Sequence, residues 1–313
     1  MKKIYSNLFV RTVLTVIAVA LTALIAVNPI AHAAQATIDL QTAEPFAILS
    51  GTPGITDAGA ASVITGNVGL SPAAGSGIGL LCTQVTGTIY AVDATGDSCF
   101  TVNGPLLVTA KNDLDTAYTD AASRTPVTIV PDELGGTTLT PGVYASTSTA
   151  LQISNIGPLV LDAQGDPSAV FIFEGSDEQA GTLTVGPGGT VSLINEASVC
   201  NVFWRVYGAT IGSTAVFKGN ILALTSITVA DGANIEGRLL ARNGQVTLIN
   251  DTIIAPVCTT SVTTSVTPSV IPKLPNTGSG SEQNTASLWA IGISSGIIIT
   301  LLSFIIVQRK RVI

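Results

Sequence analysis

Residues 225–251 read TSITVADGANIEGRLLARNGQVTLIND and contain the pattern that decides the fold. Short runs of alternating polar and aliphatic residues are separated by glycine, asparagine or aspartate. The run SITV at 226–229 returns nineteen residues later as QVTL at 245–248, and each run holds one threonine between two aliphatic residues. Because side chains on a strand alternate between its two faces, this period of two indicates short β-strands with one buried face.

The threonine-centred run recurs through the C-terminal half of the chain. It is found at Thr184, Thr210, Thr228 and Thr247, with separations of 26, 18 and 19 residues. Two further short apolar runs follow the first run in each round, and residues 151–173 resemble one earlier round. This repetition predicts a mainly β, three-sided β-solenoid whose stacked coils bury each other's aliphatic residues. A β-sandwich also has short alternating strands, but it would not return the same residue types in register at this spacing.

Residues 105–124 (PLLVTAKNDLDTAYTDAASR) depart from the period of two. Their apolar residues recur at helical spacing instead: Leu107, Ala110, Leu114, Ala117, Tyr118 and Ala121. Pro105 suits a first helical turn, and Pro126 ends the pattern. We therefore expect one long amphipathic helix that packs along one side of the coils. Aspartates on its polar face argue against a membrane surface as its partner.

Residues on either side of a buried strand residue point outward. For the first run of each round, nearly all of these outward residues are small and all are uncharged: Thr182, Thr184, Gly186, Gly208, Thr210, Gly212, Ser226, Thr228, Ala230, Gln245, Thr247 and Ile249. The second run presents Lys218 and Glu236, and the third begins near Arg238 and Arg242. The sequence thus predicts one flat, uncharged side, although Gln152 stands where an earlier threonine would continue the row.

The N-terminal residues 1–33 are typical of a secretory signal peptide, with a basic start, an apolar run and a small-x-small cleavage pattern. The run is too short for a membrane anchor, which was the alternative. The only histidine of the chain, His32, lies inside this signal. The exported protein therefore has no histidine for Ser-His-Asp or Cys-His catalysis, or for a histidine-ligated zinc site.

The C-terminal residues combine three features in a fixed order. Leu274, Pro275, Asn276, Thr277 and Gly278 spell LPNTG, residues 288–307 carry no charge, and residues 308–313 are basic. The uncharged run predicts a transmembrane helix with the basic tail in the cytoplasm. The combination resembles the cell-wall sorting signal of Gram-positive surface proteins, which implies cleavage by a sortase after the threonine and covalent attachment to peptidoglycan. A plain single-pass protein was the alternative.

Two predicted processing sites leave a strongly acidic mature chain. It keeps seven basic and nineteen acidic side chains, a net charge near −12, which argues against nucleic-acid binding. Acidic groups at Asp162 with Asp166, and at residues 174–178, could form an enzyme's acid pair or a weak Ca²⁺ site. Because they fall in glycine-rich turns without a basic partner, we expect no enzyme activity, no cofactor and no metal site.

The four cysteines are Cys82, Cys99, Cys200 and Cys258. An even number in an exported chain predicts two disulfides, for which three connectivities are possible. Absence of a C-x-x-C pair argues against structural zinc. We favour Cys82 with Cys99, which closes a short loop, and Cys200 with Cys258, which fastens the end of the domain to its body.

Three longer stretches resemble the microbial ice-binding protein family: NVFWRV at 201–206, GNILALTSITVADGANIEGRLLARNGQVTL at 219–248, and FAILSGTPGITDAGAASVITGNVGLSPAAG at 46–75. The resemblance covers about residues 38–256. It implies a right-handed, irregular β-solenoid with one long helix alongside and an N-terminal cap at about 70–103. The domain would span residues 34–258, and a Thr/Ser/Pro-rich linker, 259–273, would join it to the sorting motif.

This family resemblance also implies a function for the flat side. Its partner would be the surface of an ice crystal, bound by seven of the outward residues: Thr182, Thr184, Thr210, Ser226, Thr228, Gln245 and Thr247. The alternative is a surface adhesin of the same fold that binds a glycan, a host protein or another cell.

Overall fold

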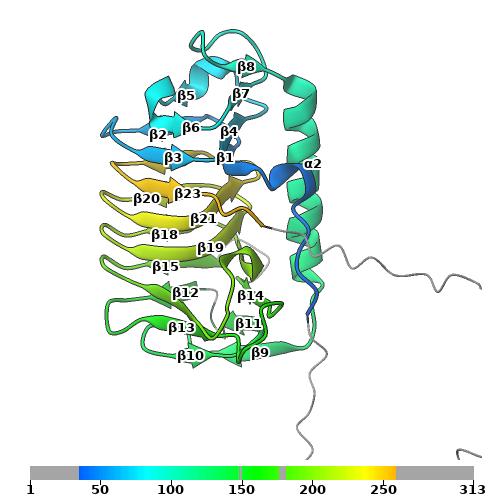
Figure 1. The fold of residues 1–313 in the computed structure, drawn as a ribbon, viewed down its shortest axis with the longest axis vertical. Coiled ribbons are helices and arrows are strands. Elements are labelled where there is room, and N and C mark those ends of the chain that lie inside the picture. The colour runs from blue at the N-terminus through cyan, green and yellow to red at the C-terminus, as the bar shows by residue number, and fades with distance from the viewer. Residues whose placement is uncertain (1–34, 147, 149, 176–180, 259–313) are drawn as a thin grey trace, which may run out of the picture. The chain divides into compact units, whose positions relative to one another are not determined.

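The computed structural model describes residues 35–146, 148, 150–175 and 181–258. These residues form parallel β-sheets and one long helix, so the mainly β prediction with a single long helix is confirmed. The strands are stacked in successive coils, with the helix lying along one side of the stack (Figure 1). The predicted signal peptide, linker, sorting motif and basic tail lie outside the described residues.

One side of the coils, called the first side below, is a sheet of seven strands among the described residues. In order of hydrogen bonding they are β12 (Ala150–Ile153), β15 (Thr182–Val185), β18 (Ala209–Ile211), β20 (Ile227–Val229), β22 (Val246–Leu248), β2 (Ile55–Asp57) and β5 (Ile78–Gly79). Aliphatic residues that alternate with the threonines are fully or almost fully buried, as the period of two predicts.

The other two sides share strands, because β19 (Val216–Ala223) and β21 (Asn234–Ala241) each turn a corner. Both strands bend at a glycine with positive φ, Gly219 and Gly237. At Gly237 a Cβ atom would stand 1.9 Å from the carbonyl oxygen of Gly219, so only glycine fits this corner.

The residues before the corner lie on the second side, and those after it lie on the third side. The second side also contains β10 (Thr138–Leu139), β13 (Leu159–Asp162), β16 (Val191–Ile194), β23 (Thr252–Ile254), β3 (Val63–Thr65) and β6 (Val85–Thr86). The third side is completed by β9 (Val127–Val130), β11 (Gly142–Ser146), β14 (Phe171–Glu174), β17 (Val202–Val206), β1 (Phe46–Ser50), β4 (Asn67–Leu70), β7 (Ile89–Ala91) and β8 (Thr101–Val102).

The order of coils in space differs from their order in the chain. The N-terminal strands β1 and β2 pair with β21 and β22, which come almost two hundred residues later. The helix α2 (Gly104–Ala122) then runs along most of the stack from β8, and the residues after it lead to β9 at the other end (Figure 1). From β9 the coils return toward β1, so the last coil meets the first.

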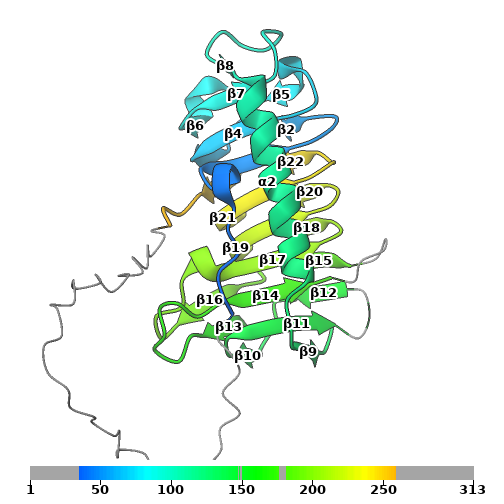
Figure 2. The same ribbon diagram turned by 90° about the vertical axis from the view of Figure 1, so that its right-hand side faces the viewer.

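Helix α2 covers most of the third side, from β7 past β21, β19 and β17 to β14 (Figure 2). Its buried residues are the six predicted from the sequence. They pack on outward residues of the third side, including Phe46, Phe203 and Leu240. The Asn103 side chain caps the helix by accepting a hydrogen bond from the backbone N–H of Leu106 at 3.1 Å.

Polar contacts also hold α2 to the coils. The Lys111 ammonium donates to the carbonyl of Ala241 at 2.6 Å. Burial lowers the pKa of Lys111 to about 8, although the nearby Asp115 carboxylate opposes this effect. Two guanidinium groups pack on the ring of Tyr118, whose centroid is 4.5 Å from Cζ of Arg205 and 4.6 Å from Cζ of Arg242.

Inside the coils, aromatic rings from consecutive strands of the third side form a stack. The ring centroids of Phe173 and Trp204 are 3.9 Å apart with the planes almost parallel, and Tyr144 continues the row 5.6 Å from Phe173. Each ring covers its neighbour in the next coil, so each coil depends on those on either side of it.

Both disulfides have the pairing that we favoured: Cys82 is bonded to Cys99, and Cys200 is bonded to Cys258. Within the described part of the chain, no helix is long and apolar enough to cross a membrane. The structure supplies no support for the transmembrane helix predicted at 288–307, which lies outside that part.

Candidate functional site

A column of threonines runs down the middle of the first side. The register of the parallel strands places Thr184, Thr210, Thr228 and Thr247 directly beside one another on β15, β18, β20 and β22. The sequence aligned these four residues, and the structure brings them together. Gln152 stands next to Thr184 at one end, at the position where the sequence lacked a threonine.

The column continues beyond Thr247 with a residue that sequence reasoning missed. Thr56 on β2 is in register with Thr247, and their hydroxyl oxygens are 3.3 Å apart. The two residues are 191 positions apart in the chain. The signal was present in Ile55–Asp57, another short run with a threonine after an aliphatic residue, but nothing in the sequence indicated that this coil stacks on the last one. Below, the threonine column means Thr56, Thr184, Thr210, Thr228 and Thr247.

The column is exposed while the aliphatic residues that flank it along each strand are buried. Thr56, Thr184, Thr210 and Thr228 are exposed and Thr247 is partly exposed. The flanking residues on the same strands, such as Ile227 and Val229, have no exposed surface. These threonine side chains therefore contribute little to the core, and their uniformity has no packing explanation.

The remaining predicted residues are partly exposed: Thr182 is the first residue of β15, and Ser226 and Gln245 directly precede β20 and β22. Several glycines beside the column do have a packing explanation. A Cβ atom on Gly212 would lie 2.6 Å from the backbone of Gly186 in the preceding coil. The residues at the edges of the first side are therefore small, because consecutive coils approach each other closely there. Below, the threonine face means the threonine column together with Thr182, Ser226 and Gln245.

The described strands of the first side present no charged side chain outward. The only acid in these strands, Asp57, accepts hydrogen bonds from the backbone N–H of Ser62 at 3.1 Å and the amide of Gln84 at 2.5 Å. Burial alone would raise the pKa of Asp57, but these hydrogen bonds outweigh it and the pKa is lowered. The carboxylate thus stays ionised at the corner and does not interrupt the threonine face.

Charged groups lie on the other sides. Lys218 and Glu236 form an ion pair on the second side, and Arg242 pairs with Asp115 of α2 on the third. The described strands of the first side thus carry a row of threonine side chains, and the ion pairs lie on the other two sides. Such a surface offers many weak contacts and no reactive group.

Asp162 and Asp166, which the sequence offered as an acid pair, accept hydrogen bonds in turns. Asp162 accepts hydrogen bonds from the backbone of Gln164 and the amide of Asn195, both at 2.8 Å, and Asp166 accepts them from Ser168. One cluster of described residues, Cys82, Cys99 and Asp97, has the spacing of metal ligands. Its two sulfur atoms form a disulfide and cannot also act as thiolate ligands.

Comparison with known proteins gives consistent results. The family model described as ice-binding-like matches residues 48–254. An ice-binding protein of Flavobacterium frigoris (strain PS1) is 42% identical over 227 residues, covering 70% of this chain and 76% of the relative. An ice-binding protein of a Colwellia species is 40% identical over 224 residues, covering 70% and 84%.

Solved structures agree with these sequence relatives. The crystal structure of an ice-binding protein from an Antarctic biological consortium is 38% identical to this chain, with a TM-score of 0.62, and covers 74% of this chain and 96% of its own. The ice-binding protein LeIBP from an Arctic yeast is 30% identical, with a TM-score of 0.61, covering 72% and 96%. On its sequence and its structure, the chain belongs to the ice-binding-like family.

Proposed function

We propose that this protein adsorbs to ice through the threonine face, carried on the first side of a right-handed, three-sided β-solenoid. The observation that carries the proposal is the threonine column: five threonines from five coils stand in register on parallel strands, on a side without outward charges. Relatives over most of the domain are ice-binding proteins by name, which supports the same ligand.

The geometry suits a crystalline ligand. Parallel strands repeat at about 4.7–4.9 Å, so the threonine column repeats at that step. Threonine is stiff at χ1 because it is β-branched, so each hydroxyl and methyl group keeps its position without a further entropy cost. Such a row can hold water molecules in an ordered arrangement that merges with an ice lattice. Each contact is weak, and a preorganised surface adds many of them together.

Neighbouring sides are less suitable for this ligand. The second side carries the ion pair of Lys218 and Glu236. Most of the third side is covered by α2, which takes up the surface that a large ligand would need there (Figure 2). Among the described residues, this leaves the first side as the broad surface that is free of outward charge and is not covered by the helix.

We further infer that the protein is exported and attached covalently to the cell wall of a Gram-positive bacterium. The basis is the signal-like N-terminus and the LPNTG motif at 274–278, followed by an uncharged run and a basic tail. A sortase would cleave between Thr277 and Gly278 and join the threonine to peptidoglycan. A tethered protein of this kind would hold the cell on ice.

The test of ice binding is to grow single ice crystals in the purified domain. We expect thermal hysteresis and faceted crystals, because an adsorbed protein stops growth on the planes it covers. Unshaped crystals without hysteresis would reject the proposal. In that case, a positive glycan array would identify the protein as an adhesin of the same fold.

A further inference from the structure

The C-terminal end of the described residues is held to the rest of the domain by several contacts. The last strand, β23 (Thr252–Ile254), has only three residues and pairs with β21 on one side and β3 on the other. Val257 after it is 94% exposed, and Cys258 is the last described residue. The predicted linker, 259–273, follows directly in the sequence.

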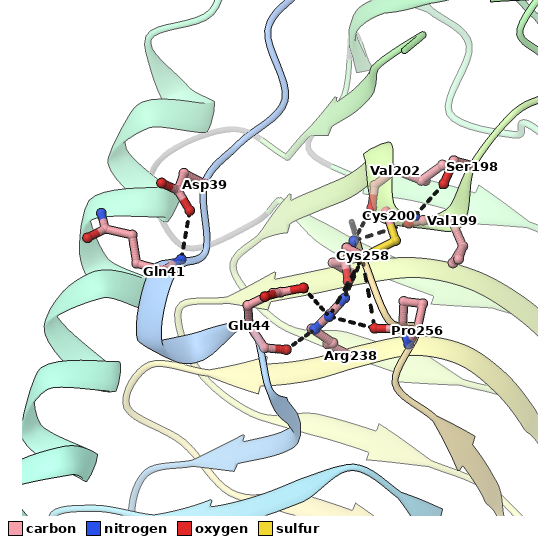
Figure 3. Close-up of polar contacts among 11 residues, drawn as sticks. Asp39, Gln41, Glu44, Ser198, Val199, Cys200, Val202, Arg238, Pro256 and Cys258 are labelled. Atoms are coloured by element: carbon pink, nitrogen blue, oxygen red, sulfur yellow. Dashed lines mark hydrogen bonds and ion pairs between the residues drawn. A yellow bond between two sulfur atoms is a disulfide. The ribbon is translucent and has the colours of Figure 1, made fainter. Parts of the chain in front are cut away.

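Cys258 is held by more than the short strand that precedes it. Its disulfide joins it to Cys200 in η4 (Val199–Asn201), the short 3₁₀ turn that directly precedes β17 (Figure 3). β17 is paired along its length with β14 on one side and β19 on the other. The disulfide thus connects the exit of the chain to a strand in the interior of the largest sheet.

A buried arginine reinforces the same point. Arg238 is 1% exposed, and its guanidinium donates to the carbonyl of Pro256 at 2.9 Å and to the carbonyl of Glu44 at 2.6 Å (Figure 3). It also donates to the Asn220 side chain at 2.8 Å, and it lies 3.4 Å from the Glu44 carboxylate. One side chain therefore ties together the coil of β21, the N-terminal coil and the residues just before Cys258.

We propose that the Cys200–Cys258 disulfide and Arg238 together form a force-bearing lock, at the point where the predicted linker to the cell wall leaves the domain. This inference rests on the proposed wall attachment, under which a cell held on ice pulls on residue 259. Without the lock, that pull falls first on the few hydrogen bonds of β23. With the lock, the disulfide passes it to Cys200 and to β17, whose hydrogen bonds on both sides must break together.

The chain provides a matched control for testing the lock. Cys82–Cys99 closes a loop of similar chemistry in the N-terminal coils, away from the exit. Cells would display the full chain as wild type, as Cys200→Ser/Cys258→Ser, or as Cys82→Ser/Cys99→Ser, with the number of copies matched by an N-terminal tag. The measurement is the shear flow at which half of the cells leave an ice surface.

We expect Cys200→Ser/Cys258→Ser to detach at a several-fold lower shear, because forced opening follows the unfolding rate of the loaded strand. Protein released by wall digestion should retain thermal hysteresis, which shows that the face is intact. The Cys82→Ser/Cys99→Ser cells should match wild type. Detachment of all three kinds of cell at the same shear, or an equal reduction of that shear in both variants, would refute the proposed lock.

Two further measurements keep the test decisive. If Cys200→Ser/Cys258→Ser does not fold, a reductant applied to displayed Cys82→Ser/Cys99→Ser leaves only Cys200–Cys258 to break, and the shear needed for detachment should then fall. If wild-type cells do not stay on ice, ice binding has failed, and the same cells are held by an antibody to the N-terminal tag instead. Lower shear resistance of the exit variant there supports the lock independently of ice, and equal resistance rejects it.

Discussion

Thr228 stands in the middle of the threonine column, with Thr210 on one side and Thr247 on the other. Replacing it with tyrosine places a ring above a flat surface and holds the neighbouring coils away from a crystal. We expect Thr228→Tyr to lose most thermal hysteresis. Stability should change by less than about 0.5 kcal/mol, because the side chain is exposed.

The matched control for Thr228→Tyr is Glu236→Tyr, on the second side. It adds the same ring to a partly exposed strand position and breaks the ion pair with Lys218. Hysteresis should stay near the wild-type value, since exposed ion pairs contribute little to stability. Equal loss in both variants, or no loss in either, at unchanged melting temperature would place the ice-binding surface elsewhere.

Thr56 tests whether the N-terminal coil belongs to the same surface. It extends the threonine column only through the pairing of β2 with β22. We expect Thr56→Tyr to reduce hysteresis, by less than Thr228→Tyr because Thr56 has only Gly79 as its outer neighbour. Full activity of Thr56→Tyr would restrict the surface to the coils between Gln152 and Thr247.

Asp251 gives the protein a dependence on pH that has an identifiable source. Its carboxylate is 1% exposed, and burial raises its pKa to about 6, although the backbone N–H groups of Ile249 and Ala233 oppose the shift. In the unfolded chain the pKa of this carboxyl is near 3.8. Between pH 3.8 and about 6, Asp251 is therefore protonated in the folded state and ionised in the unfolded state. The free energy of unfolding should therefore fall as pH rises, by about 1 kcal/mol from pH 5 to 7.

Urea unfolding at several pH values measures this slope, and Asp251→Asn should remove most of it. Asp93→Asn is the control. The pKa of Asp93 is lowered by the Thr95 hydroxyl and by backbone N–H groups, so its contribution is lost only below its ordinary value. A wild-type slope in Asp251→Asn would show that another group titrates in this range.

Among the elements, α2 has a single side-chain cap that can be tested. Asn103→Ala removes the acceptor for the Leu106 N–H and should lower the free energy of unfolding by about 1 kcal/mol. Asn112→Ala, at an exposed position inside the same helix, should change it by less than about 0.5 kcal/mol. Denaturant titration of both variants separates the cap from a general effect of removing asparagine.

Elements differed in how far the sequence could predict them. The helix and its buried face were predictable because helical spacing and flanking prolines are local signals. The four threonines from 184 to 247 were predictable because their coils follow one another in the chain. Thr56 and the buried Arg238 were not, since both depend on contacts between the N-terminal coil and residues that are almost two hundred positions away.

At the scale of the whole molecule, the LPNTG motif predicts how the protein is attached to the cell. Thr277→Ala should leave the protein in the membrane fraction or the medium, because under the proposed attachment a sortase would transfer the chain through that residue. Fractionation of cells before and after digestion of wall glycan measures this. Asn276→Ala, at the variable position of the motif, should remain wall-bound. Unchanged wall attachment in a sortase-deficient strain would refute the prediction.

The meeting of the first and last coils determines when the fold can be completed. Strand β1 leaves the ribosome early, yet its partner β21 is synthesised about 190 residues later, so the N-terminal coils wait without a neighbour on that side. Such distant pairings raise contact order and slow folding. Because the edge of β1 stays unpaired in the meantime, a chain exported as proposed above would be exposed to wrong pairing during its transit across the membrane. The interval between the first strand and its partner is therefore the period in which an export chaperone would matter most.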